Sequence, residues 1–186
     1  MFDKMKKDFT TMTWVLIPVA IAINIAIGIN GATGWIIAKL DLSIYLDTIG
    51  TIGMAVLAGP WVGALTGLLT NMILGAFSPG FIPYWPVPVA IGLVAGFCAN
   101  AGMFKHWWKV VLVGIFVAIT AAILSTLIAQ KIYGGGPLSV FYFLVEEPVD
   151  KIATVLIVFF ITRVLPKKLI AYLPRPENIE IAESPK

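Results

Sequence analysis

IYLDTIGTIGMAVLAGPWVGALTGLLTN, residues 44–71, contains two apolar helical runs that Gly59 and Pro60 separate. Proline cannot continue a helix, because it has no amide proton and its ring collides with the preceding turn. Both runs are apolar enough for a lipid bilayer, yet Asp47 lies in the first and Asn71 in the second. A carboxylate at bilayer depth is costly unless it is paired or hydrated. The stretch therefore predicts membrane helices that carry functional polar groups.

The whole chain has the composition of an integral membrane protein. Of its 186 residues, 59% are hydrophobic and 12% are charged, and its mean hydropathy is +0.94. A soluble core of this size cannot bury so much apolar surface. We predict a single domain, an all-α membrane protein with a compact bundle of six transmembrane helices. The expected spans are residues 13–29, 44–58, 61–77, 87–104, 110–132 and 149–165.

The distribution of basic residues predicts the orientation of this bundle. Residues 1–12 form a basic N-terminal segment, residues 13–165 the bundle, and residues 166–186 a cytoplasmic tail, of which we expect the polar stretch 173–186 to fray. With a cytoplasmic N-terminus, most lysines and arginines fall in the inner segments, as the positive-inside rule requires. An even number of spans then places both termini in the cytoplasm. Because the basic residues lie at helix ends, the net charge of +3 does not indicate nucleic-acid binding.

On this topology the polar residues gather near the outer ends of the helices. Mostly apolar walls with a few convergent polar groups are typical of a small-molecule site. We therefore predict an outward cavity that binds a ligand. The predicted binding residues are Asn30, Asp47, Asn71, Tyr84, Trp85, Gln130, Glu147, Asp150 and Lys151.

The charged members of this set also have structural interpretations. Glu147 stands four residues before Lys151, which is the favourable order for a helical ion pair. Glu147 and Pro148 could also simply cap the sixth helix, because proline is common in the first turn and the helix dipole favours a carboxylate there. Asp47 could pair with Lys151 across the bundle, although intramembrane carboxylates are usually functional.

The uncharged members have alternatives as well. Tyr84 and Trp85 are equally well explained as interfacial aromatic residues. Asn71 could form a hydrogen bond between helices without touching a ligand.

Motifs of enzymes and metal sites are absent from the sequence. It has no HExxH, CxxC, GxSxG or P-loop pattern. The single histidine, His106, lies beside Trp107 and Trp108 and is interpreted as an interfacial anchor. We predict that the chain is not an enzyme and holds no metal or cofactor. The alternatives to ligand capture in the outward cavity are a stand-alone secondary carrier or channel, which the lack of a convincing inverted repeat disfavours, and a scaffold without a ligand.

Small residues recur at intervals of four, which places them on one helix face and lets two backbones approach closely. Packing within the bundle is the first interpretation of any such pair, and partner docking is the second. The pairs are Ala22 and Ala26, Gly59 and Gly63, Gly63 and Gly67, Gly92 and Gly96, and Ala118 and Ala122.

Taken together, these features resemble the S component of an energy-coupling factor (ECF) vitamin transporter. The resemblance rests on six short spans, the small pair in the first helix, the run from residue 45 to residue 71, and PVAIGLVAGF at residues 88–97. Within that family the chain is most similar to the S components assigned to hydroxymethylpyrimidine or pyridoxine. It lacks the histidine-bearing N-terminus of the metal-specific members, which argues against nickel or cobalt.

The resemblance implies a subunit of the bacterial cell membrane that binds one vitamin with high affinity at its outer face. It implies delivery of that vitamin with a transmembrane T component and two ABC-type ATPases, which use ATP and Mg. It also implies that Ala22 and Ala26, with Ala20 and Gly28 as neighbours, meet the T component. Asn24 would then point away from that face into the bundle, and residues 30–43 would form a lid.

Overall fold

The computed structural model describes residues 7–30, 45–134 and 137–179, and every regular element in these ranges is helical. The predicted all-α class is therefore confirmed for this part of the chain. The longer helices are α2 (Thr11–Asn30), α4 (Ile49–Ala58), α5 (Pro60–Phe77), α6 (Pro86–Asn100), α7 (Trp107–Tyr133) and α8 (Pro137–Val164). The short elements are the 3₁₀ helices η1 (Pro79–Tyr84), η2 (Met103–Lys105) and η3 (Pro176–Asn178), and the helix α9 (Lys167–Ala171).

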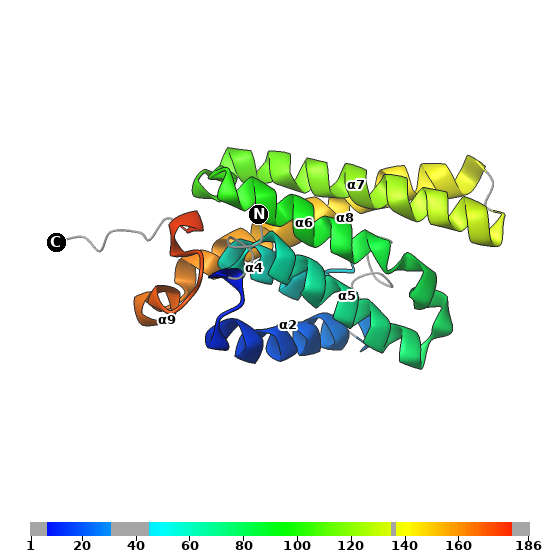
Figure 1. Ribbon diagram of the computed structural model, residues 1–186. Coiled ribbons are helices and arrows are strands. Elements are labelled where there is room, and N and C mark those ends of the chain that lie inside the picture. The colour runs from blue at the N-terminus through cyan, green and yellow to red at the C-terminus, as the bar shows by residue number, and fades with distance from the viewer. Residues whose placement is uncertain (1–6, 31–44, 135–136, 180–186) are drawn as a thin grey trace.

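The longer helices lie alongside one another in a bundle (Figure 1). α7 packs against α8, α5 against α6, and α2 against α4 and α5. The connector η1 lies at one end of the bundle, and α9 lies at the opposite end, near the C-terminus (Figure 1). We call the first the cavity end. We call the second the basic end, because Lys105, Lys109, Arg163 and Lys168 belong to the elements that meet there.

Three helices within the described ranges are long and apolar enough to cross a membrane, namely residues Thr11–Gly28, Pro60–Phe77 and Trp107–Ile132. α4 and α6 are also apolar but have only 10 and 15 residues. α8 is longer, with 28 residues, but Glu147, Asp150 and Lys151 interrupt its apolar sequence. Length and composition are therefore those of a membrane-associated helical protein.

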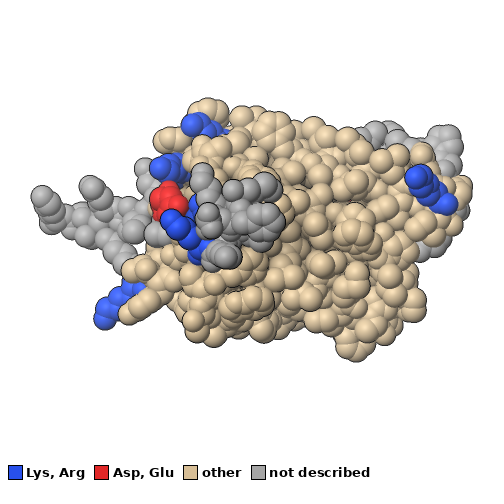
Figure 2. Space-filling view, in the orientation of Figure 1, with Lys and Arg blue, Asp and Glu red and all other residues tan. Residues whose placement is uncertain are grey.

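The outer surface agrees with this composition. α7 exposes one apolar stripe at helical spacing, and water-soluble monomers rarely expose so long a patch. Its members are Leu112, Ile115, Phe116, Ile119, Ile123 and Leu127. On the face shown in Figure 2, the charged side chains lie toward the two ends, and a broad uncharged band separates them. Such a band is suited to contact with lipid.

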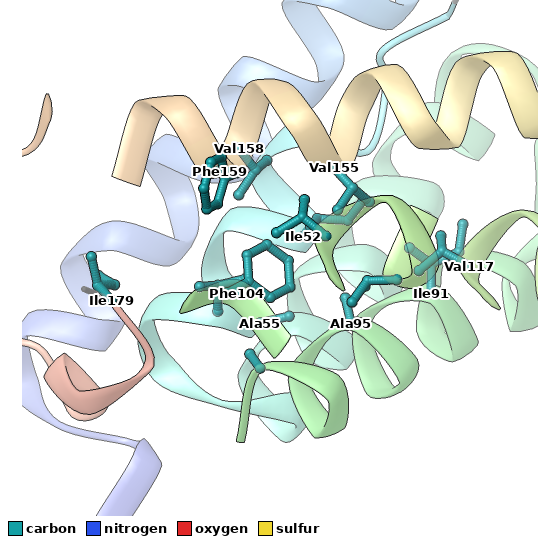
Figure 3. Close-up of a cluster of buried hydrophobic side chains, with 14 of the residues drawn as sticks. Ile52, Ala55, Ile91, Ala95, Phe104, Val117, Val155, Val158, Phe159 and Ile179 are labelled. Carbon is teal, nitrogen blue, oxygen red and sulfur yellow. The ribbon is translucent and has the colours of Figure 1, made fainter. Parts of the chain in front are cut away.

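The interior between the two ends holds a cluster of buried apolar side chains. Ile52 of α4, Val155 of α8 and Phe104 of η2 are almost fully buried in it, and Figure 3 shows their side chains gathered at its centre. Ile91 of α6 and Val117 of α7 extend the cluster toward the cavity end. Packing of this kind leaves no polar group to satisfy and fixes the helices relative to one another.

The small-residue pairs of α5 and α6 pack against each other inside the bundle. A Cβ on Gly92 would overlap the backbone of Gly63 and Ala64, and a Cβ on Gly96 would overlap Pro60. Ala118 and Ala122 of α7 are buried as well. For these pairs, packing within the bundle is confirmed, because their faces are already occupied by neighbouring helices.

The predicted fraying of residues 173–186 is wrong for the described part of that segment. Arg175 donates to the Asp8 carboxylate from Nε at 2.8 Å, with its Nη2 atom 2.6 Å from the same oxygen. Asn178 donates to the Val56 carbonyl at 3.0 Å, and Ile170 is 2% exposed. Burial raises the pKa of Asp8 above its ordinary value, although Arg175 opposes that shift. Asp8, near the start of the described residues, and Arg175 and Asn178, near their end, therefore lie together at the basic end of the bundle.

Two predicted helix boundaries also need correction. α4 begins at Ile49 rather than at residue 44, so Asp47 lies in the turn before the helix and not one turn inside it. α8 begins at Pro137 rather than at residue 149, so Glu147 lies inside the helix and does not cap its first turn. The interior position of Pro148 explains the second error, because proline usually marks a helix start.

Candidate functional site

A cavity of about 400 Å³ lies at the cavity end, between α4, α5, α6, α7, α8 and η1. Its volume is within the range of roughly 300–1,000 Å³ that is usual for small-molecule sites. Its lining combines apolar residues with hydroxyl, amide and charged groups. The lining residues are Asp47, Thr48, Thr51, Gly67, Thr70, Asn71, Leu74, Ser78, Gly80, Phe81, Tyr84, Val87, Pro88, Ile91, Ser125, Glu147 and Lys151.

One face of α5 forms a wall of this cavity. Gly67, Thr70, Asn71 and Leu74 are spaced by three or four residues, which places them on one side of the helix. A Cβ on Gly67 would lie 2.6 Å from the Pro88 carbonyl oxygen, so glycine permits α6 to approach closely at this point. The amide of Asn71 thereby comes to lie in the cavity wall between two closely packed helices.

Aromatic and apolar side chains form the remaining surfaces. Phe81 and Tyr84 come from η1, which has no buried residue of its own. Val87 and Ile91 come from α6, and Ile91 also belongs to the buried apolar cluster. The cluster in Figure 3 therefore reaches the cavity wall at Ile91.

Four ionisable side chains form what we call the charge cluster: Asp47, Glu147, Asp150 and Lys151. The Lys151 ammonium group donates a hydrogen bond to Asp150. It lies 3.6 Å from an oxygen of Asp47 and 3.6 Å from an oxygen of Glu147. The side chains of Lys151 and Asp150 are 7% and 2% exposed. Both predicted pairings of Lys151, with Glu147 and with Asp47, are therefore present as ion pairs.

Asp150 fixes the position of Asp47 from across the bundle. Its Oδ1 atom accepts a hydrogen bond from the Leu46 amide at 2.8 Å. Leu46 has a φ of 51°, a left-handed conformation that is uncommon for a leucine. The hydrogen bond thus holds the residue before Asp47 in an unfavourable conformation, and the Asp47 carboxylate reaches the cavity as a result.

Several buried polar atoms at the cavity have no hydrogen-bond partner among the described residues. They are Asp47 Oδ1, Thr48 Oγ1, Asn71 Oδ1 and Glu147 Oε2. Thr48 and Asn71 are each only 6% exposed. A buried polar atom without a partner costs about 1–3 kcal/mol. Asp47 Oδ1 and Glu147 Oε2 are the atoms that lie 3.6 Å from Lys151, so Thr48 and Asn71 are the residues that lack a partner altogether. Such residues in a cavity wall are typical of a place where a bound molecule supplies the partner.

Asn24 supports the cavity wall from behind. Its side chain is fully buried and donates to Thr51 at 3.0 Å and to Thr70 at 3.1 Å. Its Oδ1 atom accepts from the Gly50 amide at 2.7 Å. The expectation that Asn24 points into the bundle is confirmed. The two threonines that it orients line the cavity.

The structure brings together five of the nine predicted binding residues in the cavity lining: Asp47, Asn71, Tyr84, Glu147 and Lys151. Asp150 lies directly behind them, bonded to Lys151. Trp85 and Gln130 are exposed and do not line the cavity. The side chain of Asn30 and the predicted lid, residues 30–43, fall outside what the structure describes, except that Asn30 ends α2.

Sequence reasoning missed the hydroxyl and phenyl groups of the site. Thr48, Thr51, Thr70, Ser125 and Phe81 all line the cavity. The one signal that was available is that Thr48 and Thr51 stand close to Asp47 in the sequence. Thr70 and Ser125 stand in apolar runs, where such residues are ordinary, and Phe81 stands in the proline-rich connector 77–88.

The four predicted docking residues of α2 do not share one face. Ala22 and Ala26 are exposed on the outside of the bundle. Ala20 is 6% exposed and packs toward α4, since a Cβ on Gly50 would overlap its carbonyl group. A Cβ on Gly28 would lie 3.4 Å from the Asp47 Cβ atom, so Gly28 faces the turn that carries Asp47.

Comparison with known proteins adds no identification, since no protein family, curated protein or solved structure matches the chain. Conclusions about function therefore rest on the geometry of the cavity and its surroundings.

Proposed function

We propose that this chain is the substrate-capture subunit of an ATP-driven importer of the energy-coupling factor type. It binds a small water-soluble vitamin or precursor in the cavity, with hydroxymethylpyrimidine or pyridoxine as the favoured ligands. A transmembrane T component and two ABC-type ATPases complete the importer, and ATP and Mg are used by those ATPases. The chain itself catalyses no reaction.

The observation that carries this proposal is the set of buried polar atoms without a hydrogen-bond partner around one small cavity. Asn71 presents an oxygen atom without a hydrogen-bond partner, and Asp47 and Glu147 present carboxylate oxygens that lie 3.6 Å from Lys151 and accept no hydrogen bond. Phe81 and Tyr84 provide aromatic surfaces for a flat ring. A site that leaves polar groups unpaired when the wrong molecule enters discriminates strongly between similar ligands. High-affinity capture of one nutrient requires such a site.

The proposed setting is a bacterial cell membrane, which the chain crosses six times with both termini in the cytoplasm. The position of Lys105, Lys109, Arg163 and Lys168 at the basic end supports this orientation. The cavity end then faces outward, where the nutrient arrives. A channel or carrier is less well supported, because the apolar cluster separates the cavity from the basic end.

Ligand binding by the isolated chain is the direct test. In a thermal-shift screen of vitamins and their precursors, a specific ligand at about 100 times its Kd stabilises the protein by about 2.7 kcal/mol. Calorimetry then gives the affinity. We expect Asn71→Ala to weaken binding by at least about tenfold, because the ligand loses a buried partner.

Gln130→Ala is the matched control, since Gln130 is an exposed amide outside the cavity and its loss is expected to leave the affinity unchanged. The proposal would be refuted if no vitamin or precursor bound to the chain while the chain was shown to be folded by its melting temperature. Ion-coupled uptake by vesicles that contain this chain without ATPases would favour the carrier alternative. A scaffold role predicts that Asp47→Asn and Asn71→Ala alter stability only.

A second prediction concerns docking through the exposed small residues of α2. Replacing Ala22 or Ala26 by leucine is expected to reduce co-purification with the T component by at least about tenfold, because close backbone approach needs small side chains. Ligand affinity should stay within about twofold, since both residues lie outside the cavity lining. Ala76→Leu, at an exposed position of α5, is the control. Equal loss of docking and of ligand affinity would contradict a dedicated docking face.

A further inference from the structure

The charge cluster carries more negative than positive charge. Three carboxylates surround the ammonium group of Lys151: Asp47 and Glu147 at 3.6 Å, and Asp150 through a hydrogen bond. Three negative charges against one positive charge leave two negative charges in formal excess. Unpaired charge in a partly dry site is costly. The cluster therefore favours a bound group that brings positive charge.

The three carboxylates of this cluster differ in their bonding partners and in whether they line the cavity. Asp150 does not line the cavity, and both of its oxygens are used, one by the Leu46 amide and the other by Lys151. Asp47 and Glu147 line the cavity, and the oxygen of each that lies 3.6 Å from Lys151 accepts no hydrogen bond. Asp150 therefore neutralises Lys151, and the excess charge is presented to the cavity by Asp47 and Glu147.

Independent evidence for a ligand comes from other elements. Asn71 on α5 and Thr48 in the turn before α4 are each 6% exposed, line the same cavity, and have a side-chain oxygen without a partner. Neither residue belongs to the charge cluster. The acidic groups therefore adjoin a built polar site and are not an isolated surface patch.

We propose that the cavity selects its ligand by charge, taking a flat organic cation whose N–H groups donate to Asp47 and Glu147. The inference rests on the proposed function, because it takes this cavity to be the capture site. A protonated ring nitrogen or an amidine-like group meets the requirement, with the ring between the apolar wall of α6 and the aromatic residues of η1. An anionic ligand is excluded by repulsion from the same carboxylates.

Four probes of similar size separate charge from hydrogen bonding: benzamidine, benzamide, benzoate and phenyltrimethylammonium. Binding is measured by ligand-observed NMR with the full chain in neutral detergent. Benzamidine is expected to bind at least about tenfold more tightly than benzamide, because charge-assisted hydrogen bonds are roughly twice as strong as neutral ones. Benzoate is expected not to bind. Phenyltrimethylammonium, which has no N–H donor, is expected to bind more weakly than benzamidine.

Variants then locate the effect. Glu147→Gln keeps the shape of the side chain but removes its charge. It is expected to lower the affinity for benzamidine by about tenfold and to change the affinity for benzamide by less than about twofold. Glu177→Gln is the control, since that carboxylate is 62% exposed beside Arg175 at the other end of the bundle. Melting temperatures of both variants establish that they fold.

The outcomes distinguish this inference from the proposed function. Selection by charge would be overturned if benzamide, benzoate or phenyltrimethylammonium bound as tightly as benzamidine or more tightly. It would also be overturned if benzamidine did not bind, even if a vitamin binds. If benzamidine binds as expected but no vitamin or precursor does, the charge preference stands and the importer function fails.

Discussion

Lys151→Met is expected to destabilise the protein by about 3–5 kcal/mol, which is the usual cost of leaving buried charges without their partner. The Lys151 side chain is 7% exposed and is the counter-ion of Asp47, Glu147 and Asp150. Without it, three carboxylates share a partly dry site and repel one another. Unfolding by denaturant or heat in detergent measures the change, and lower pH should restore part of the stability by protonating the carboxylates.

Lys168→Met is the matched control, because Lys168 is exposed on α9 and surface substitutions usually change stability by less than about 0.5 kcal/mol. The double variant Lys151→Met with Asp150→Asn should be more stable than the single Lys151 variant, since it removes one of the repelling charges. Wild-type stability of the single variant would mean that Lys151 does not hold the charge cluster together.

Gly92→Ala is expected to destabilise the protein by about 2–3 kcal/mol, although it adds only one methyl group to a helix. The added Cβ would lie 2.5 Å from the Ala64 amide nitrogen and 2.7 Å from the Gly63 carbonyl oxygen. Backbone atoms cannot move aside as a flexible side chain can, so α5 and α6 must separate. Because both helices contribute cavity walls, ligand affinity should fall together with the melting temperature.

Gly53→Ala provides the control for the same chemical change. Nothing lies within 4 Å of a Cβ at Gly53, in the interior of α4. Alanine favours a helix over glycine by about 0.8–1.0 kcal/mol, so this variant is expected to be slightly more stable than the wild type. Similar effects of the two substitutions would contradict close packing of α5 and α6 at Gly92.

The helices were predictable to the extent that their signals are local. Gly59 and Pro60 divide α4 from α5 as expected, because a proline lacks the amide that helix continuation needs. The start of α8 was not predictable in this way. Pro148 was read as a helix start, but it lies inside a longer helix whose position depends on packing against α7.

The candidate site was predictable where a residue is costly in an apolar segment. Asp47, Asn71, Glu147 and Lys151 stood out for that reason, and all four line the cavity. Trp85 was predicted as well but does not line the cavity. An aromatic residue at a helix end is equally well explained by a place at the membrane interface. Thr51 and Thr70 were missed, since threonine in an apolar run satisfies its own hydroxyl and is no signal by itself.

The sequence by itself determined an all-helical, strongly apolar protein with its costly polar residues toward one end of the predicted spans. Those properties follow from hydropathy and from proline and glycine positions, which act over a few residues. Only the tertiary structure decided how the polar residues combine. Leu46 and Asp150 are 104 positions apart, and their hydrogen bond, with the shared ammonium of Lys151, turns separate carboxylates into one cluster beside one cavity. Electrostatic and hydrogen-bond energies depend on distances between atoms, and those distances are set by the packing of helices.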